Sequence, residues 1–191
     1  MEFIEADIPG CFEIQPRVMK DRRGYFVKNF QASQLARLGL ETEFKEDYFS
    51  LSEPGVLRGM HFQVPPADHA KIVCCLQGEV MDVVVDLRKG SPTFGEHRIF
   101  QLSDENMKML YLPKGMAHGF YVPSRPSLLL YKVSTEYDAK NDSGVLWSSL
   151  GINWPNLQPI ISDRDQGFLP LSDFDSPFVY TGKNSPVDIQ I

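Results

Sequence analysis

Two of the four histidines stand in settings that suit proton chemistry. His61 lies in an extended segment two residues after Gly59, where the absence of a side chain lets another backbone approach closely. From the residues alone, His61 could be a catalytic base or a structural histidine. His118 follows a Pro-x-Gly turn and enters the next extended run, whereas His69 and His97 have no such setting and favour surface roles.

The segments that must position these histidines have the pattern of strands. Short apolar and β-branched runs alternate with Gly- and Pro-rich turns at 71–76, 80–87, 97–102, 108–112, 120–122 and 128–134. Residues 1–31 suggest short extended pieces around a turn at 20–24, and the one good helical candidate begins near Ser33 and stops at Gly39. Strands with this spacing predict an antiparallel sandwich or barrel.

The run at residues 80–86 predicts how one of these strands is buried. Met81, Val83 and Val85 share one face, and Asp82 and Asp86 share the other. We therefore expect one packed face and one unpacked face on this strand.

The chain changes character after residue 138, where Asp, Asn, Ser and Pro become frequent. Trp147 and Trp154 are the expected anchors of a tail folded onto the strands. Residues after about 170 are expected either to be poorly ordered or to dock on a partner subunit.

Charge and composition exclude several classes of protein. The 19 Lys and Arg against 25 Asp and Glu give a net charge of −6, so no global positive field attracts a nucleic acid. An apolar content of 42% excludes a disordered chain. The apolar runs are far shorter than the roughly 20 residues of a membrane span. The acidic N-terminus carries no export signal, and adjacent Cys74 and Cys75 would point to opposite faces of a strand, so we expect a cytoplasmic protein without disulfides.

The spacing Pro113-x-Gly115-x-x-His118 is half of the metal motif of cupin barrels. The other half needs His-x-His and a downstream carboxylate, so that three or four ligands converge. Here it reads His61-Phe62-Gln63, without the second histidine. We therefore expect no metal and no other cofactor, and a site that works by acid–base chemistry.

A series of motifs in register gives the chain a specific resemblance. It is similar to the dTDP-4-dehydrorhamnose 3,5-epimerase family over roughly residues 8–166. The motifs are Asp-x-Arg-Gly-x-Phe at 21–26, Gly-Val-Leu-Arg-Gly-Met-His-Phe-Gln at 55–63, Pro-Pro at 65–66, Lys-Ile-Val at 71–73, Gly-Glu-Val-x-Asp-Val-x-Val-Asp-Leu-Arg-x-Gly-Ser-Pro-Thr-Phe-Gly at 78–95, Leu-Pro-x-Gly-x-Ala-His-Gly-Phe at 112–120, Tyr-Lys at 131–132 and Ser-x-x-Asp at 162–165.

This resemblance implies an all-β, cupin-type jelly-roll barrel with short flanking helices. We expect a single domain over residues 1–191, with a barrel core at about 56–137 and a C-terminal extension at 138–191 packed on it. The family is free of cofactors and acts in dTDP-rhamnose and O-antigen biosynthesis. It epimerises a nucleotide-bound 4-keto-6-deoxyhexose at C3 and C5 through an enolate, most simply dTDP-4-dehydro-6-deoxy-D-glucose to dTDP-4-dehydro-L-rhamnose.

The resemblance also implies the roles of particular residues. His61 is the base, Asp165 its carboxylate partner, Tyr131 the acid across the sugar ring, and Lys71 the cation that stabilises the enolate oxygen.

Further residues are implied to bind the substrate. Arginines suit a diphosphate because the guanidinium matches phosphate oxygens bidentately. Within the family the arginine of Asp-x-Arg-Gly comes from the neighbouring subunit, which implies a homodimer. The expected substrate-binding residues are Arg23, Phe26 as a stacking surface for the base, Lys28, Glu46, Tyr48, Arg58, Gln63, His69, His118 and Tyr137.

Three departures from the family pattern lie around this site. Lys28 replaces a usual glutamate, Glu46-Asp47-Tyr48 replaces a Gln-Asp-Asn run, and His69 replaces a glutamine. These changes keep open a single-carbon epimerase or a substrate with another nucleobase or sugar. A non-catalytic sugar-nucleotide binding protein and a metal-dependent cupin oxygenase or isomerase are the remaining alternatives.

Overall fold

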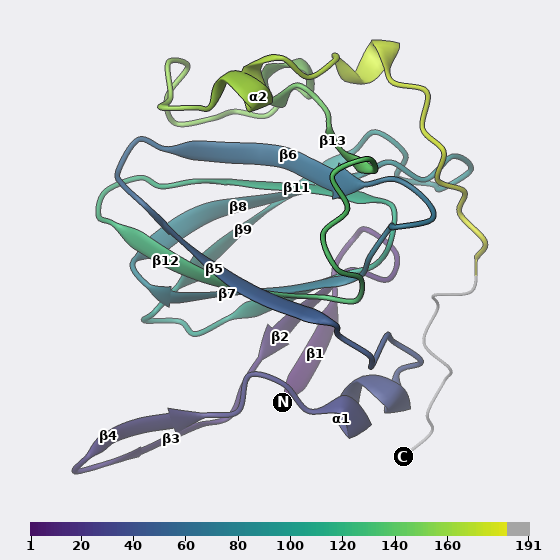
Figure 1. Ribbon diagram of the computed structural model, residues 1–191. Helices are drawn as coiled ribbons and strands as arrows, with labels where there is room; N and C mark the ends of the chain where they lie inside the picture. The colour runs from purple at the N-terminus through teal and green to yellow at the C-terminus, as the bar shows by residue number, and fades with distance from the viewer. Residues whose placement is uncertain (183–191) are drawn as a thin grey trace.

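Two antiparallel sheets face each other in the computed structural model, which describes residues 1–182 (Figure 1). The six-stranded sheet has the spatial order β1 (Glu2–Glu5), β2 (Phe12–Gln15), β10 (Met109–Leu112), β7 (Lys71–Gln77), β12 (Ser127–Val133) and β5 (Glu46–Ser52). The five-stranded sheet has the order β13 (Asp142–Gly144), β6 (Leu57–Gln63), β11 (Met116–Tyr121), β8 (Glu79–Asp86) and β9 (His97–Ser103). This arrangement confirms the predicted all-β jelly-roll class.

The core between the sheets follows from alternation along the strands. In β12 the residues Leu129, Tyr131 and Val133 are buried, and the residues between them are more exposed. The adjacent cysteines of β7 point to opposite sides as predicted, since Cys75 belongs to the core between the sheets and Cys74 to a separate cluster. All three cysteines are free thiols.

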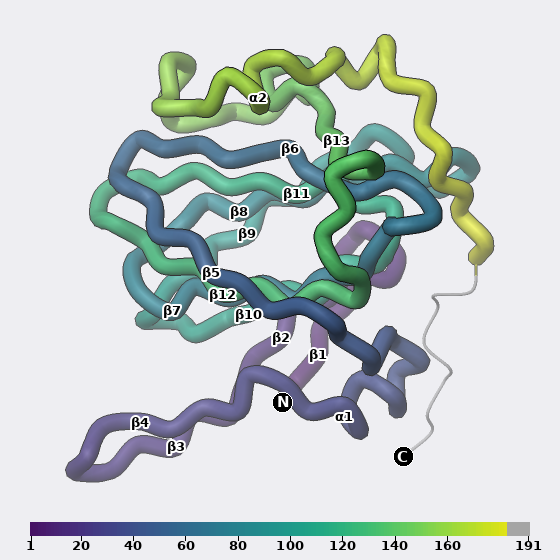
Figure 2. Tube along the Cα trace, in the orientation of Figure 1, coloured from purple at the N-terminus to yellow at the C-terminus, as the bar shows by residue number. Residues whose placement is uncertain are grey.

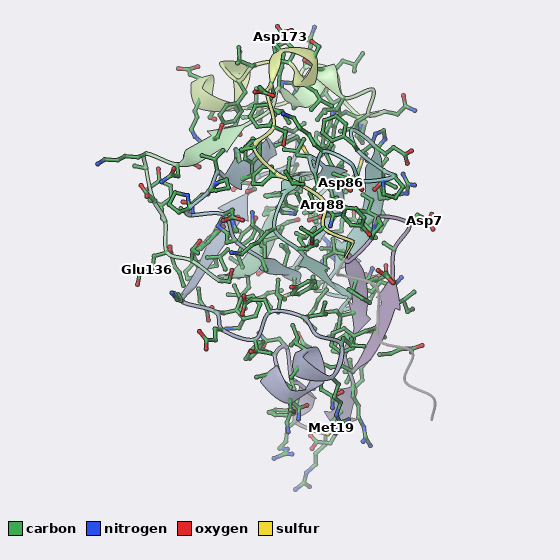
Figure 3. The ribbon with its side chains drawn as sticks, turned by 90° about the vertical axis from the view of Figure 1, so that its right-hand side faces the viewer. Asp7, Met19, Asp86, Arg88, Glu136 and Asp173 are labelled. Atoms are coloured by element: carbon green, nitrogen blue, oxygen red, sulfur yellow. The ribbon has the colours of Figure 1, made fainter. Side chains whose placement is uncertain are left out.

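Strand β8 corrects the expectation of one unpacked face. Asp82 and Asp86 are fully buried, alongside Val80 and Val84 of the core between the sheets. The aspartates are accommodated because each has a partner. His118 Nε2 lies 2.8 Å from Asp82, while Asp86 accepts hydrogen bonds of 2.9 and 2.8 Å from Arg88, beside which it lies (Figure 3).

The opposite face of β8 is covered by the C-terminal extension. Val83 and Val85 share a hydrophobic cluster with Trp154 and Phe178, and Trp147 packs against that cluster. In Figures 1 and 2 the extension lies over β6 and then runs down one side of the barrel. The two tryptophans are thus confirmed as anchors of the described part of this extension, residues 138–182.

Docking on a partner subunit stays a prediction for the residues after about 170, but the expected poor order is wrong for residues 170–182. They include the short 3-10 helix η2 (Leu171–Asp173), and Phe178 is buried against the chain's own barrel because its ring fills the cluster outside β6. A further 3-10 helix, η1, covers Trp147–Ser149. The same expectation for residues 183–191 lies outside the described residues.

Two elements from the N-terminal part of the chain lie outside the barrel (Figure 1). The hairpin of β3 (Val18–Asp21) and β4 (Gly24–Val27) extends away from the sheets, with its turn at Arg22 and Arg23 (Figure 1). Helix α1 (Ala32–Arg37) follows and ends before Gly39, which has a left-handed φ of 66°. The predicted turn at 20–24 and the predicted helix are both confirmed.

Candidate active site

A cavity of about 470 Å³ opens between the two sheets. It contains residues from both sheets, so groups on it can approach a bound molecule from two sides. Among the candidate residues it is lined by Glu46, Tyr48, Arg58, His61, Gln63, His69, Lys71, His118, Tyr131 and Tyr137.

A close approach of β6 and β11 shapes the wall that carries His61. A Cβ added at Gly119 would lie 2.7 Å from the Arg58 carbonyl oxygen and 2.9 Å from the Gly59 Cα, so only glycine fits. The register of β6 and β11 shifts between His118 and Phe120, and irregular pairing of this kind re-aims side chains. Residues three apart in a regular strand point to opposite faces. The irregular pairing here lets both Arg58 and His61 line the cavity.

His61 forms a hydrogen-bonded pair with Asp165. Its Nε2 lies 2.8 Å from Asp165 Oδ1, and the second carboxylate oxygen accepts a 3.0 Å hydrogen bond from the Gly59 amide. Asp165 is buried in the short helix α2 (Asp163–Gln166), where the Asp165 amide donates to the N-cap Ser162 side chain. The pair therefore has a fixed carboxylate and a histidine whose other nitrogen, Nδ1, is left to act as a base.

The environment of His61 keeps it neutral. Burial lowers its pKa below the usual value; Asp165 opposes this shift, and the positive charges of Arg164 and Lys71 add to it. Burial of Asp165 works in the opposite direction, but the hydrogen bonds from His61, the Gly59 amide and the Ser162 side chain outweigh it and lower the pKa of Asp165. The neutral imidazole beside a carboxylate is the form that accepts a proton.

Tyr131 and Lys71 face the cavity from the other sheet. Burial raises the pKa of the Tyr131 phenol well above its usual range, so the phenol stays protonated and holds a proton that it can give to a substrate. Burial lowers the pKa of Lys71 to about 8, although the negative charges of Asp82 and Asp142 partly offset that effect. The two residues place a proton donor and a titratable cation opposite His61.

His118 is held as firmly as His61. Its Nε2 lies 2.8 Å from Asp82 Oδ2, and both side chains are almost completely buried. The Asp82 Oδ1 atom is buried without a hydrogen-bond partner among residues 1–182. His118 therefore presents its other ring nitrogen to the cavity in a fixed orientation.

Two candidate substrate-binding residues also support the cavity wall. The Gln63 amide donates to the Ala67 carbonyl at 2.9 Å and accepts from the Asp138 amide at 2.6 Å, so it fixes the loop after β12. Glu46 accepts a 2.6 Å hydrogen bond from the Tyr137 amide. Both side chains therefore support the wall as well as facing the cavity.

The surface role considered for His69 from its local sequence is wrong. His69 lines the cavity, and its Nδ1 lies 3.2 Å from the Gln63 amide nitrogen. Burial lowers the pKa of His69 to about 3, so this side chain is neutral at physiological pH. His97 lies on β9, outside the cavity lining.

Three candidate residues are not brought into the cavity by this chain. Arg23, Phe26 and Lys28 lie on or just after the β3–β4 hairpin, outside the cavity lining. The Arg23 guanidinium pairs with Asp21 of the same hairpin, and the Phe26 side chain is 57% exposed. None of these three residues therefore lines the cavity of its own chain.

The structure adds a residue that sequence reasoning did not select. Arg164 Nη1 lies 3.0 Å from His61 Nε2 and 3.3 Å from Asp165 Oδ1, and its Nη2 lies 2.6 Å from Asp142. The guanidinium also lies over the Phe168 ring. The position next to Asp165 in the sequence was the available signal, but adjacent helical residues do not face each other, so only the structure shows that both side chains contact His61.

Neither a metal-binding cluster nor a membrane-spanning helix occurs in the described part of the chain. No group of three or more His, Cys, Asp or Glu side chains among residues 1–182 is placed to hold a metal ion. No helix in the same range is long and apolar enough to cross a membrane.

Comparison with known proteins gives consistent matches over most of the chain. The profile of the dTDP-4-dehydrorhamnose 3,5-epimerase family matches residues 5–173. A dTDP-4-dehydrorhamnose 3,5-epimerase from Shigella flexneri is 42% identical over 168 residues, which cover 86% of this chain and 93% of the relative.

Solved structures agree with this match. The dTDP-6-deoxy-D-glucose-3,5-epimerase of Legionella pneumophila, in complex with dTDP-4-keto-L-rhamnose, aligns with a TM-score of 0.89 and 37% identity over 94% of this chain and 98% of that one. A 3'-monoepimerase of Streptomyces bikiniensis in complex with dTDP-quinovose aligns with a TM-score of 0.82 and 32% identity over 87% of this chain and 86% of that one.

Proposed function

The chain belongs to the dTDP-4-dehydrorhamnose 3,5-epimerase family, and we propose that it converts dTDP-4-dehydro-6-deoxy-D-glucose to dTDP-4-dehydro-L-rhamnose. The observation that carries this proposal is the cavity itself, in which the hydrogen-bonded His61 and Asp165 on one side face Tyr131 and Lys71 on the other. Inversion next to a ketone needs a base, an acid on the opposite side and a cation for the oxyanion, and these four residues supply them.

The proposed reaction needs only the substrate, these four residues and solvent water as a source and acceptor of protons. His61 removes the proton from a carbon beside the C4 ketone, and the electron pair moves onto the ketone oxygen as an enolate. The Lys71 ammonium donates a hydrogen bond to that oxygen. Tyr131 then protonates the same carbon from the opposite face while the ketone re-forms, and solvent returns the Tyr131 proton and takes the one held by His61. The same sequence at the second carbon completes a 3,5-epimerisation.

A single-carbon epimerisation is the second candidate. The similarity of the chain to the 3'-monoepimerase supports this candidate function. So do Glu46, Tyr48 and His69 in the cavity lining, because they depart from the usual family residues. Deuterium at C3 alone, or at C5 alone, in the product formed in heavy water would identify this outcome.

We propose that the protein is a homodimer in which the β3–β4 hairpin of one subunit completes the cavity of its partner. Arg23 and Phe26 lie outside their own cavity, and the hairpin and the edge strand β5 expose large apolar side chains. These side chains are Met19, Tyr25 and Phe26 on the hairpin and Phe49 and Leu51 on β5. An apolar surface of this kind is typical of an interface.

Activity should be restored when two defective subunits are combined. We expect Arg23→Ala to raise KM at least about 10-fold through loss of a charged hydrogen bond to the diphosphate, and His61→Ala to be inactive. A mixed dimer of the two holds one site with both an intact His61 and an intact partner hairpin. Co-expression should therefore restore the original low KM, which neither variant has alone, and no recovery of that KM would place Arg23 in its own subunit's site.

The catalytic proposal is tested by solvent exchange. We expect His61→Ala and Asp165→Ala to abolish deuterium incorporation from heavy water into the nucleotide 4-keto sugar, read by NMR, with circular dichroism unchanged. His97→Ala, a histidine change outside the cavity, should exchange like the unaltered protein. Wild-type-like exchange in either dyad variant contradicts the assignment, and binding without exchange in the unaltered protein would indicate a non-catalytic sugar-nucleotide binding protein.

The acid role of Tyr131 predicts a different defect. Tyr131→Phe should slow reprotonation more than proton removal, so exchange or elimination continues while net inversion is lost. Inversion at the original rate in this variant would remove Tyr131 from the mechanism.

We further propose a cytoplasmic location and a role in rhamnose-containing polysaccharide synthesis. The free thiols of Cys11, Cys74 and Cys75 suit a reducing compartment, and the proposed product is an activated precursor of L-rhamnose.

A further inference from the structure

Two tyrosines stack against each other at the proposed proton donor. Tyr48 on β5 lies directly opposite Tyr131 on β12 in the antiparallel register. Their ring centroids are 4.7 Å apart and the ring planes differ by 18°. Stacked arrangements are among the preferred geometries of aromatic pairs. The contact therefore favours one orientation of the Tyr131 ring.

Tyr131 belongs to the hydrophobic core between the sheets, and its hydroxyl and ring have further specific contacts besides this stack. The Tyr131 hydroxyl lies 3.3 Å from the Ser50 hydroxyl, near the upper limit of a hydrogen bond, and the His118 ring approaches in an edge-on arrangement with centroids 6.2 Å apart. Tyr48 and Ser50 are alternate residues of β5, so they share the face that lines the cavity. One edge strand thus supplies both a surface for the ring and a partner for the hydroxyl.

Within the protein, Tyr48 contacts Tyr131 through its ring, and its hydroxyl is not used for such a contact. Its hydroxyl makes no hydrogen bond with any residue in the range 1–182, whereas its ring covers Tyr131. Burial, with the negative charges of Glu46 and Asp142, raises the pKa of Tyr48 to about 12, so the phenol is neutral at physiological pH. This pattern fits a side chain selected for its flat surface.

We propose that Tyr48 is a positioning residue that holds the Tyr131 ring against β5, and that it thereby decides whether an enolate in the cavity is protonated on the inverting face. The second part rests on the proposed function. Because proton removal by His61 takes place on the opposite side of the cavity, loss of the stack should impair inversion and spare exchange.

Two variants separate the ring of Tyr48 from its hydroxyl. Tyr48→Leu removes the stack, and Tyr48→Phe, the matched control, retains it. We expect Tyr48→Leu to lower the ratio of net inversion to deuterium exchange at least about 10-fold, since a positioned general acid is worth about 10²–10⁴-fold. Tyr48→Phe should keep the original ratio. An unchanged ratio in Tyr48→Leu, or an equal loss in both variants, overturns the proposal, the latter by showing that the hydroxyl binds the substrate.

A measurement without substrate keeps the proposal independent of the catalytic assignment. In protein with ¹³C-labelled tyrosine, the Tyr131 resonance is identified by its disappearance in Tyr131→Phe. We expect its ring-current shift to change and its ring-flip rate to rise in Tyr48→Leu but not in Tyr48→Phe. An unchanged Tyr131 signal in Tyr48→Leu overturns the positioning role even if the protein acts on another substrate. Absence of exchange in the unaltered protein contradicts only the proposed function.

Discussion

At the scale of single residues, the site depends on ionisable groups that are moved away from their usual protonation behaviour by burial. Lys71 is buried with no ion pair to a carboxylate among residues 1–182, so its ammonium group is held charged only by more distant aspartates. His61 has a carboxylate at hydrogen-bond distance, yet its burial still favours the neutral ring. A base that is neutral and a cation that is charged coexist only in a limited pH range.

The activity should therefore fall on both sides of a plateau. Proton removal needs neutral His61, whose pKa is lowered, so the acid limb should lie below pH 6.5, the usual value for histidine. Oxyanion stabilisation needs charged Lys71, so activity should fall as pH rises through about 8. Lys71→Arg should retain some activity and lose this alkaline limb, because a guanidinium stays charged to beyond about pH 12. If the fall of activity near pH 8 persists in Lys71→Arg, the fall is caused by the titration of another group.

Arg164 gives a second prediction for the acid limb. Its positive charge lies beside His61 and contributes to lowering the pKa of that histidine. Arg164→Met removes the charge, so the His61 pKa should rise and the acid limb of kcat should move to higher pH. Arg125→Met, at a surface arginine paired with Asp104, is the matched control and should leave the limb in place. An acid limb that stays in place in Arg164→Met would show that the charge does not act on His61.

At the scale of elements, strands β6 and β11 deliver His61 and His118 to the cavity because their backbones approach unusually closely. Gly59 and Gly119 permit that approach, and a Cβ on either would meet atoms of the other strand at under 3 Å. The same contact anchors Asp165, which accepts a hydrogen bond from the Gly59 amide. The packing of β6 on β11 and the position of Asp165 beside His61 thus both depend on Gly59.

Gly119→Ala should therefore damage stability and chemistry together. We expect a loss of roughly 1–3 kcal/mol in the free energy of unfolding, as for other overpacked sites, together with a drop in kcat. Gly167→Ala is the matched control, because its Cβ would come no closer than 3.4 Å to any neighbour. Urea unfolding measures both variants, and equal stability of the two would show that β6 and β11 can separate without cost.

At the scale of the whole molecule, the C-terminal extension completes the outer face of the five-stranded sheet and also carries Asp165 into the site. Trp154 and Phe178 share one hydrophobic cluster with β6, β8 and β11. Asp165 reaches across from α2 to β6. Barrel and extension should therefore be one cooperative unit, in line with a single domain.

Unfolding should show this cooperativity directly. Both tryptophans of the chain, Trp147 and Trp154, lie in the extension, so their fluorescence reports on it, whereas far-ultraviolet circular dichroism reports mainly on the barrel strands. The two signals should change with the same urea midpoint. Separate midpoints would contradict the expected single domain and indicate an extension that unfolds independently.

The sequence by itself determined most of the strands, the helix after residue 31 and the family, whereas strands β5 and β13 were not predicted. Apolar runs between Gly and Pro turns are local signals, and motifs in register identify His61, Lys71, Tyr131 and Asp165 as candidates without any knowledge of distance.

Only the tertiary structure decided what covers each face and which side chains meet. Alternation in β8 separates two faces, but it does not show that His118 and Arg88 satisfy the buried Asp82 and Asp86. The stack of Tyr48 on Tyr131 joins residues far apart in the chain. Such contacts depend on strand pairing and on the covering of one element by another, which are non-local interactions that no short stretch of sequence encodes.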